Sequence, residues 1–212
     1  MLACRTLFAT TVSSAIASTS VCVQLGLRTC SNALCWGLVM LGSVGVKDYC
    51  ASTVSNPMNV RRFKHDDAER LAQIYHEAVH RVGRRYYSQA QLNAWSPRPV
   101  SEREFVERLS DGRSVFVAVD RTGRPLGFIE LETDGHIDCF YCCPSAVGTG
   151  VGTALYRRLE EFASEAGLTR LYVEASEAAR QLFLSRGFAV IRRREFELNG
   201  VSIHNYLMEK RI

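Results

Sequence analysis

The sequence predicts one α/β domain over residues 58–212, with a mixed central sheet flanked by helices. Three observations support this fold class. Apolar residues recur at helical spacing in some segments and form short runs typical of strands in others. Glycine, proline, Asn-Gly and Asp-Gly separate these segments. The same part of the 212-residue chain carries all but three of the 26 basic residues and all but one of the 22 acidic residues.

The composition, 47% hydrophobic and 23% charged, is that of a globular protein and excludes a collagen, a coiled coil or a wholly disordered chain. The net charge of +4 is slight and spread along the chain. So slight an excess does not form the basic patch that nucleic-acid-binding proteins carry, and we therefore expect no nucleic-acid partner.

Residues 1–57 have a different composition, acid-poor and rich in serine, threonine, alanine and cysteine. They are interpreted as a leader outside the fold: a transit peptide, an anchor segment, or a stretch upstream of a start at Met58. The apolar run 33–46 has about fourteen residues, short of the roughly 20 that a spanning helix needs. A start at Met58 is favoured, which predicts a cytoplasmic domain with no membrane contact, whereas a transit peptide predicts import into an organelle.

The first elements are a strand at 60–63 and a helix at 66–82. Asp66 followed by Glu69 is typical of a capping box, and Gly83 ends the helical pattern. Residues 86–99 are expected to be irregular, because aromatic residues and two prolines interrupt any period. A second helix is expected at 101–109, again opened by a capping box, Ser101 with Glu104.

Three strands follow, at 114–119, 126–131 and 136–143; Asp134-Gly135 is the turn before the third, and Pro144 ends it. The glycine-rich segment 146–152 opens a helix that runs to residue 166, and a strand at 171–174 follows. Ser176 caps a helix to residue 185, and a hairpin at 188–198 and 201–209 closes the chain. The order is β-α-α-β-β-β-α-β-α-β-β, a meander before a βαβ crossover, which predicts a mixed sheet.

The turn at Gly148, Gly150 and Gly152 has the features of a phosphate-binding site. Glycine lets the backbone approach a ligand closely, and the helix that follows presents unpaired N–H groups and a partial positive charge. The spacing fits neither a P-loop nor a Rossmann fingerprint. Glycines also serve packing at helix starts, so the motif alone is weak evidence.

Two segments together resemble the GNAT superfamily of N-acetyltransferases. Gly150-x-Gly152 at a helix start is similar to the acetyl-CoA loop, Gln/Arg-x-x-Gly-x-Gly/Ala, and 179–188 (ARQLFLSRGF) is similar to the family's Ala-x-x-x-Tyr-x-x-x-Gly-Phe. The order of elements also matches, and the resemblance covers residues 59–211. The segment 87–95 (YSQAQLNAW) and His136-Ile137-Asp138 resemble a bacterial single-domain branch.

The resemblance implies a GNAT fold that transfers an acetyl group from acetyl-CoA to a primary amine. The pantetheine arm then lies between strands 136–143 and 171–174, and a backbone N–H near Tyr141 or Cys142 polarises the thioester carbonyl. The implied cofactor-binding residues are Tyr141, Cys142, Gly148, Thr149, Gly150, Val151, Gly152 and Thr153. Acetyl-CoA is a co-substrate, and no metal is expected.

Three residues depart from the family pattern. Val147 stands where Gln or Arg is usual and Thr149 where Arg is common, so side-chain contacts to phosphate are lost and weaker cofactor binding is expected. Phe183 stands where many members place the tyrosine that protonates the thiolate. Phenylalanine has no proton to give, so water or another group must serve, or the thiolate leaves unprotonated.

The candidate catalytic residues are His136 and Asp138, two apart on one strand and therefore on one face. A histidine titrates near neutrality, which suits a general base. The alternative is that His136 is a surface residue at a strand end. Glu130 and Glu174 on neighbouring strands are the reserve candidates.

Other side chains have two interpretations each. Tyr86, Tyr87 and Trp95 form either an aromatic wall for the acceptor or a small satellite core. The cysteines at 139, 142 and 143 favour core packing in a reducing compartment over a metal site, since no second Cys or His pair follows at zinc spacing. The run Arg192-Arg193-Arg194 is interpreted as a solvated strand edge.

The predicted function is therefore acetyl transfer to a small-molecule or peptide amine with general-base assistance. Val147 and Phe183 motivate an alternative, a non-catalytic acyl-CoA-binding or sensing module on the same fold. A third interpretation, a membrane-tethered interaction protein, is supported only by the apolar run 33–46. The sequence does not identify the acceptor amine. It is compatible with both a monomer and a homodimer.

Overall fold

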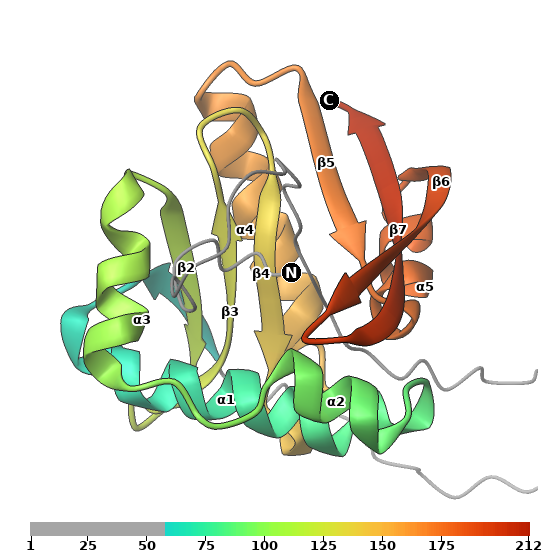
Figure 1. Cartoon of the computed structure of the whole chain (residues 1–212). Helices are drawn as coiled ribbons and strands as arrows, with labels where there is room; N and C mark the ends of the chain where they lie inside the picture. The colour runs from blue at the N-terminus through green and yellow to red at the C-terminus, as the bar shows by residue number, and fades with distance from the viewer. Residues whose placement is uncertain (1–57) are drawn as a thin grey trace, which may run out of the picture.

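The computed structural model describes residues 58–212, so the predictions for the leader, including the apolar run 33–46, lie outside the described residues. Two antiparallel sheets form the domain (Figure 1). The first has the order β1-β2-β3-β4, with β1 Asn59–Arg62, β2 Ser114–Val119, β3 Pro125–Leu131 and β4 Ile137–Cys142. The second has the order β5-β7-β6, with β5 Arg170–Ala175, β6 Ala189–Leu198 and β7 Val201–Arg211.

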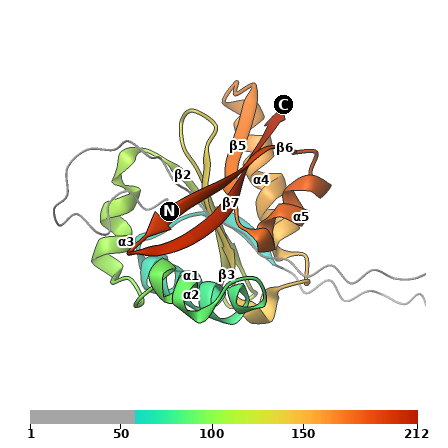
Figure 2. The same ribbon diagram turned by 45° about the vertical axis from the view of Figure 1, so that its right-hand side comes forward.

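The helices cover both faces of the first sheet (Figures 1 and 2). On one face lie α1 (Ala68–Arg81), α2 (Gln89–Trp95) and α3 (Glu102–Arg108); on the other lie α4 (Val151–Glu165) and α5 (Glu177–Ser185). Ring contacts follow the alternation of side chains along β4: Tyr141 meets Tyr75 of α1, whereas Phe140 meets Phe183 of α5. The core therefore has two layers, one on each side of β2, β3 and β4.

The predicted fold class is confirmed, with one difference in the sheet. Instead of one continuous mixed sheet, two antiparallel sheets meet where β4 and β5 run parallel, joined by a single bridge between His136 and Tyr172. Gly135 makes this approach possible, because a Cβ at this position would lie 2.2 Å from the carbonyl oxygen of Arg170. Its φ of +92° also favours glycine.

The prediction that residues 86–99 are irregular is wrong, because α2 lies within them. Ser88 caps α2 by accepting a hydrogen bond from the Gln91 N–H, and Gln91 accepts one from Ser88 in return. This capping box was present in the sequence but was masked by the surrounding aromatic residues and prolines.

The prediction of a capping box formed by Asp66 and Glu69 is also wrong. Asp67 instead precedes α1, and its carboxylate accepts hydrogen bonds from the Lys64 N–H at 2.8 Å and from Arg61 at 2.6 Å. The capping box of Ser101 with Glu104 and the cap at Ser176 are confirmed.

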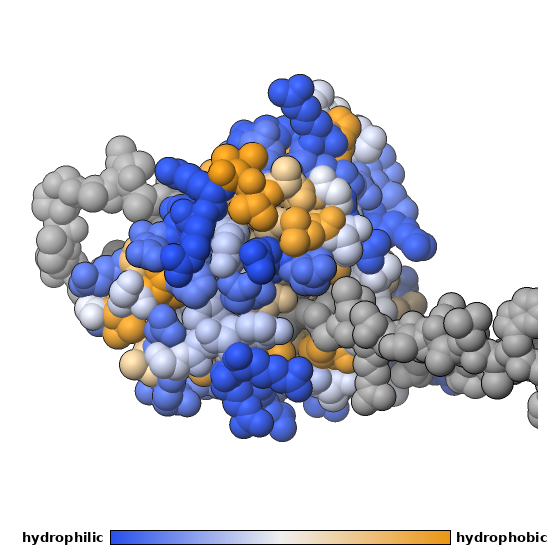
Figure 3. Space-filling view, turned by 90° about the vertical axis from the view of Figure 1, so that its right-hand side faces the viewer, coloured by the Kyte–Doolittle hydropathy of each residue, from blue (hydrophilic) through white to orange (hydrophobic). Residues whose placement is uncertain are grey.

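The surface is largely hydrophilic on the face that carries α5, β6 and β7, apart from an apolar patch (Figure 3). Exposed large apolar side chains of α5 and β6 are Leu184, Val190 and Ile191. Within residues 58–212, no helix has both the length and the apolar character needed to cross a membrane.

Candidate active site

The glycine turn has the geometry expected of a phosphate site. Gly148 and Gly150 have φ values of +80° and +93°, and Gly150 is the N-cap of α4 with no side chain capping the helix. The first helical hydrogen bond runs from the Ala154 N–H to the Gly150 carbonyl. The N–H groups of residues 151–153 therefore have no partner within the helix and are available to an anion.

Thr149 contributes less than expected. Both its N–H, at 3.3 Å, and its hydroxyl, at 2.8 Å, bond to the carbonyl of Ala146. With Val147 beside it, the turn itself offers no basic side chain to a phosphate.

β4 presents a free edge to the gap between the sheets. Leu126 and Cys143 are opposite each other, and the Cys143 N–H bonds to the Leu126 carbonyl at 2.7 Å. Because N–H groups alternate along a strand, the N–H of Cys142 points away from β3, toward β5. Of the two residues proposed to polarise a carbonyl, the backbone direction therefore favours Cys142.

A β-bulge interrupts β4 between Phe140 and Ile137. Three residues of β3, from Ile129 to Leu131, lie opposite four of β4, from Ile137 to Phe140, so β4 carries one extra residue. The bulge changes the direction of β4 next to Asp138 and Cys139.

His136 is buried, with 5% exposure, so the surface interpretation is wrong. Its Nδ1 lies 3.1 Å from Glu132 and its Nε2 lies 3.0 Å from Glu174, and its ring stacks on Tyr172. Burial alone would lower the pKa of His136, but the hydrogen bonds to Glu132 and Glu174 outweigh burial and raise this pKa to about 9. The side chain is therefore an imidazolium at neutral pH.

Asp138 lies in a buried ionic cluster with Glu130, Arg108 and Arg113. Arg108 forms two hydrogen bonds with Glu130 and one, at 3.1 Å, with Asp138. Arg113 pairs with both carboxylates and continues to Glu132 at 3.0 Å. Burial and the neighbouring Glu130 raise the pKa of Asp138 to about 6 despite the two guanidinium groups.

The cluster extends across both sheets. Glu132 joins Arg113 to His136, His136 joins Glu132 to Glu174, and Arg194 of β6 pairs with Glu174 at 2.5 Å. The interpretation of 192–194 as a solvated edge therefore fails for Arg194. Sequence reasoning also missed Arg108, although its spacing of three from Phe105 places an arginine on the apolar face of α3, which indicates a buried ion pair.

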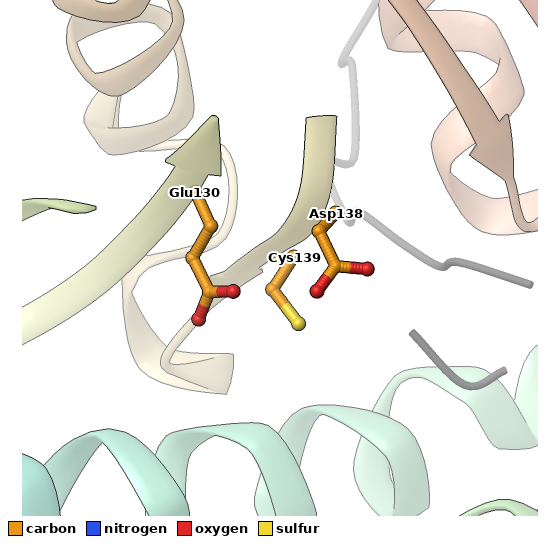
Figure 4. Close-up of side chains that lie close together, drawn as sticks. All are labelled: Glu130, Asp138 and Cys139. Carbon is orange, nitrogen blue, oxygen red and sulfur yellow. The ribbon is translucent and has the colours of Figure 1, made fainter. Parts of the chain in front are cut away.

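Within residues 58–212, two groups of side chains have atoms close enough to hold a metal ion. Glu130, Asp138 and Cys139 form one (Figure 4), and Glu132, His136 and Asp138 form the other. Arg108 and Arg113 already supply positive charge to these carboxylates. The cysteines at 139, 142 and 143 are free thiols in the core, and burial raises the pKa of Cys142 to about 12.

The structure brings together only two of the three aromatic residues assigned to the acceptor. Tyr87 and Trp95 are buried and pack edge to face at 5.2 Å, whereas Tyr86 is 47% exposed. The Tyr87 hydroxyl donates to the His204 carbonyl and accepts from the Glu177 N–H. These contacts favour the satellite-core interpretation for Tyr87 and Trp95.

Comparison with known proteins defines the class of this fold and site. Residues 84–210 match the family described as the acetyltransferase (GNAT) domain. The chain belongs to this family and is an acyltransferase that depends on acetyl-CoA.

Individual relatives of known sequence or structure agree with this family assignment. An N-acetyltransferase of Escherichia coli strain K12, YafP, described as uncharacterized, is 29% identical over 153 residues, 72% of this chain and 95% of the relative. The crystal structure of a GCN5-related N-acetyltransferase from Rhodopseudomonas palustris is 33% identical, with a TM-score of 0.67 over 73% of this chain and 95% of the other. A phosphinothricin acetyltransferase from Sinorhizobium meliloti, in complex with acetyl-CoA, shares the fold at 21% identity and a TM-score of 0.60, over 73% and 88%.

Proposed function

We propose that the protein transfers the acetyl group of acetyl-CoA to a primary amine of a small molecule or peptide by direct attack. The observation that carries this proposal is the uncapped N-terminus of α4 directly after the free edge of β4. The pyrophosphate accepts hydrogen bonds from the N–H groups of the turn, chiefly those of residues 151–153. The pantetheine arm extends between β4 and β5.

In this arrangement the Cys142 N–H donates to the thioester carbonyl and stabilises the oxyanion that forms during attack. The amine nitrogen forms a bond to the carbonyl carbon, the carbon–sulfur bond breaks, and coenzyme A leaves as a thiolate. Phe183 has no acidic proton to give to that thiolate, and it is fully buried among Phe140, Tyr156 and Phe188. We assign this proton to water.

His136 is the proposed base, positioned by Glu132, Glu174 and the nearby Asp138. With its pKa near 9, about one molecule in a hundred holds the neutral imidazole at pH 7. The base therefore works best in mildly alkaline solution. Glu130 is a weaker candidate, because, although burial raises the pKa of its carboxyl, the charges and hydrogen bonds of Arg108 and Arg113 hold this pKa below the usual range and make it a poor base.

An assay of thiol release tests the function. Acetyl-CoA is incubated with amines, polyamines, aminoglycosides and peptides, and free coenzyme A is measured. We expect amine-dependent release for at least one acceptor class, and none with Gly150→Glu, which places a strained, negatively charged side chain where the pyrophosphate lies. Coenzyme A binding with only background release for every amine would contradict the proposal and favour a sensing module.

We also propose that residues 58–212 fold and bind acetyl-CoA without residues 1–57. Residues 58–212 supply two hydrophobic layers, and Met58 at the domain boundary packs against this core. A Cβ at Gly150 of the turn would lie 3.9 Å from the Met58 side chain. A chain starting at Met58 is expected to melt cooperatively and to gain thermal stability with acetyl-CoA as the full chain does. A short chain that is unfolded, or that gains nothing from acetyl-CoA, would place the boundary elsewhere.

A further inference from the structure

Arg186 is a cation beside the phosphate turn that comes from a different part of the chain. It follows α5, and its Nη2 donates to the Thr153 hydroxyl at 2.7 Å. Thr153 is the third residue of α4, so the guanidinium lies at the N-terminal turn of that helix. The guanidinium carbon is also 5.7 Å from the centre of the Tyr156 ring.

Arg186 forms no ion pair within residues 58–212, whereas its neighbours Arg180 and Lys210 pair with Glu177 and Glu160. The charge of Arg186 does lower the pKa of Glu160, but Lys210 is the cation that pairs directly with this carboxylate. A helix N-terminus carries a partial positive charge, so a cation at this place is unfavourable unless an anion accompanies it. The arrangement is that of an anion site whose anion is not part of the protein.

A second observation concerns hydrogen bonding. The Nε–H of Arg186 is buried and has no partner in the described part of the chain. Buried donors are nearly always satisfied, and an unsatisfied one indicates a missing ligand, water or ion. Arg186 therefore has no direct ion-pair partner in the described residues and an unused donor next to the N–H groups of residues 151–153.

We propose that Arg186 binds the pyrophosphate of coenzyme A and replaces the basic side chains that the turn lacks at Val147 and Thr149. The inference rests on the proposed position of coenzyme A at residues 148–153. Thr153 is a positioning residue, because its hydroxyl holds the guanidinium beside the turn. The guanidinium and the helix N-terminus then face the same anion, and the negative charge of that anion offsets the repulsion between them.

Calorimetric titration with coenzyme A and with dephospho-coenzyme A, which lacks the 3′-phosphate, tests the proposal. Arg186→Gln is expected to weaken both ligands equally, by about 10- to 100-fold, the range for a charge-assisted hydrogen bond. Arg186→Lys keeps the charge and should recover part of the loss. Arg103→Gln is the matched control: it removes an arginine that is 86% exposed on α3, on the other face of the first sheet from α4 and α5, and should change affinity less than about twofold.

Wild-type affinity in Arg186→Gln would overturn the proposal. Weakening of coenzyme A alone would move Arg186 to the 3′-phosphate and overturn the pyrophosphate assignment. If the wild-type protein binds neither ligand, the proposed function fails first, which is a separate result.

Thr153→Val covers the case in which Arg186→Gln does not fold. It keeps the backbone N–H and removes the hydroxyl that positions Arg186. We expect severalfold weaker binding of both ligands and a lower dependence of affinity on salt, because the guanidinium is no longer held at the phosphate. Unchanged affinity and unchanged salt dependence would contradict the proposal.

Discussion

Replacing Arg108 by methionine is expected to lower the free energy of unfolding by about 3–5 kcal/mol, the usual cost of removing one partner from a buried ion pair. Arg108 and Glu130 are almost fully buried, with side-chain exposures of 2% and 0%. Without Arg108, Glu130 and Asp138 share the single guanidinium of Arg113 in an environment with little water. Methionine fills a similar volume, so the loss reports charge rather than a cavity.

Urea denaturation of the wild type and the variant measures this difference. Arg103→Met on the same helix is the control, because the Arg103 side chain is 86% exposed and its ion pair with Glu107 is solvated. That change should cost less than about 1 kcal/mol. Equal effects of the two substitutions would show that the buried cluster adds nothing to stability.

His136→Ala is expected to lower kcat by about 10²–10⁴, the usual contribution of a general base, while the coenzyme A dissociation constant stays nearly constant. In the wild type, the rate should rise with pH up to about 9, because neutral His136 forms only as the pH reaches its pKa. Two acceptor amines of different pKa separate this effect from deprotonation of the acceptor. The rise of the rate toward pH 9 in the pH–rate profile should be common to both amines and absent from the His136→Ala variant.

Glu132→Gln gives a milder test of the same assignment. Glu132 accepts a hydrogen bond from His136, so removing the charge of Glu132 should lower the pKa of His136. The rise of the rate with pH should then occur at lower pH, and activity should remain. A His136→Ala enzyme with wild-type kcat from pH 6 to 9 would place the base elsewhere, with Glu174 the next candidate.

The raised pKa of His136 also links stability to pH. Protonation is stronger in the folded state, so the stabilising contribution is fully present below the unfolded pKa near 6.5 and is lost as pH rises through about 9. The stability difference between wild type and His136→Ala should therefore be larger at pH 6 than at pH 9.5.

The sequence predicted best those features that depend on neighbouring residues. Gly148 and Gly150 indicated the turn because residue type alone permits their positive φ values. The Ser101–Glu104 cap is likewise local. The ionic cluster could not be predicted this way, because Arg108, Glu130 and Arg194 come together only through pairing of distant strands and the packing of α3.

The protonation state of His136 shows the same limit. The sequence predicted that His136 and Asp138 lie on one strand. The ordinary pKa of a histidine, near neutrality, suggested that His136 acts as a base at neutral pH. Glu132 and Glu174, four and 38 positions away, determine the actual charge. Local patterns thus indicated the residues of the candidate site, and long-range contacts set the charge that these residues carry.

The separation of β4 from β5 has a consequence for the protein before it meets its cofactor. Apart from the bridge at His136, two strand edges face each other near the middle of the domain rather than at its outer rim. Exposed edges are templates for pairing with other chains, and proteins commonly shield them. In the proposed arrangement the amides of the pantetheine arm pair with both edges at once. Bound coenzyme A would then also protect the domain from aggregation, by occupying the place where a strand of another chain could add.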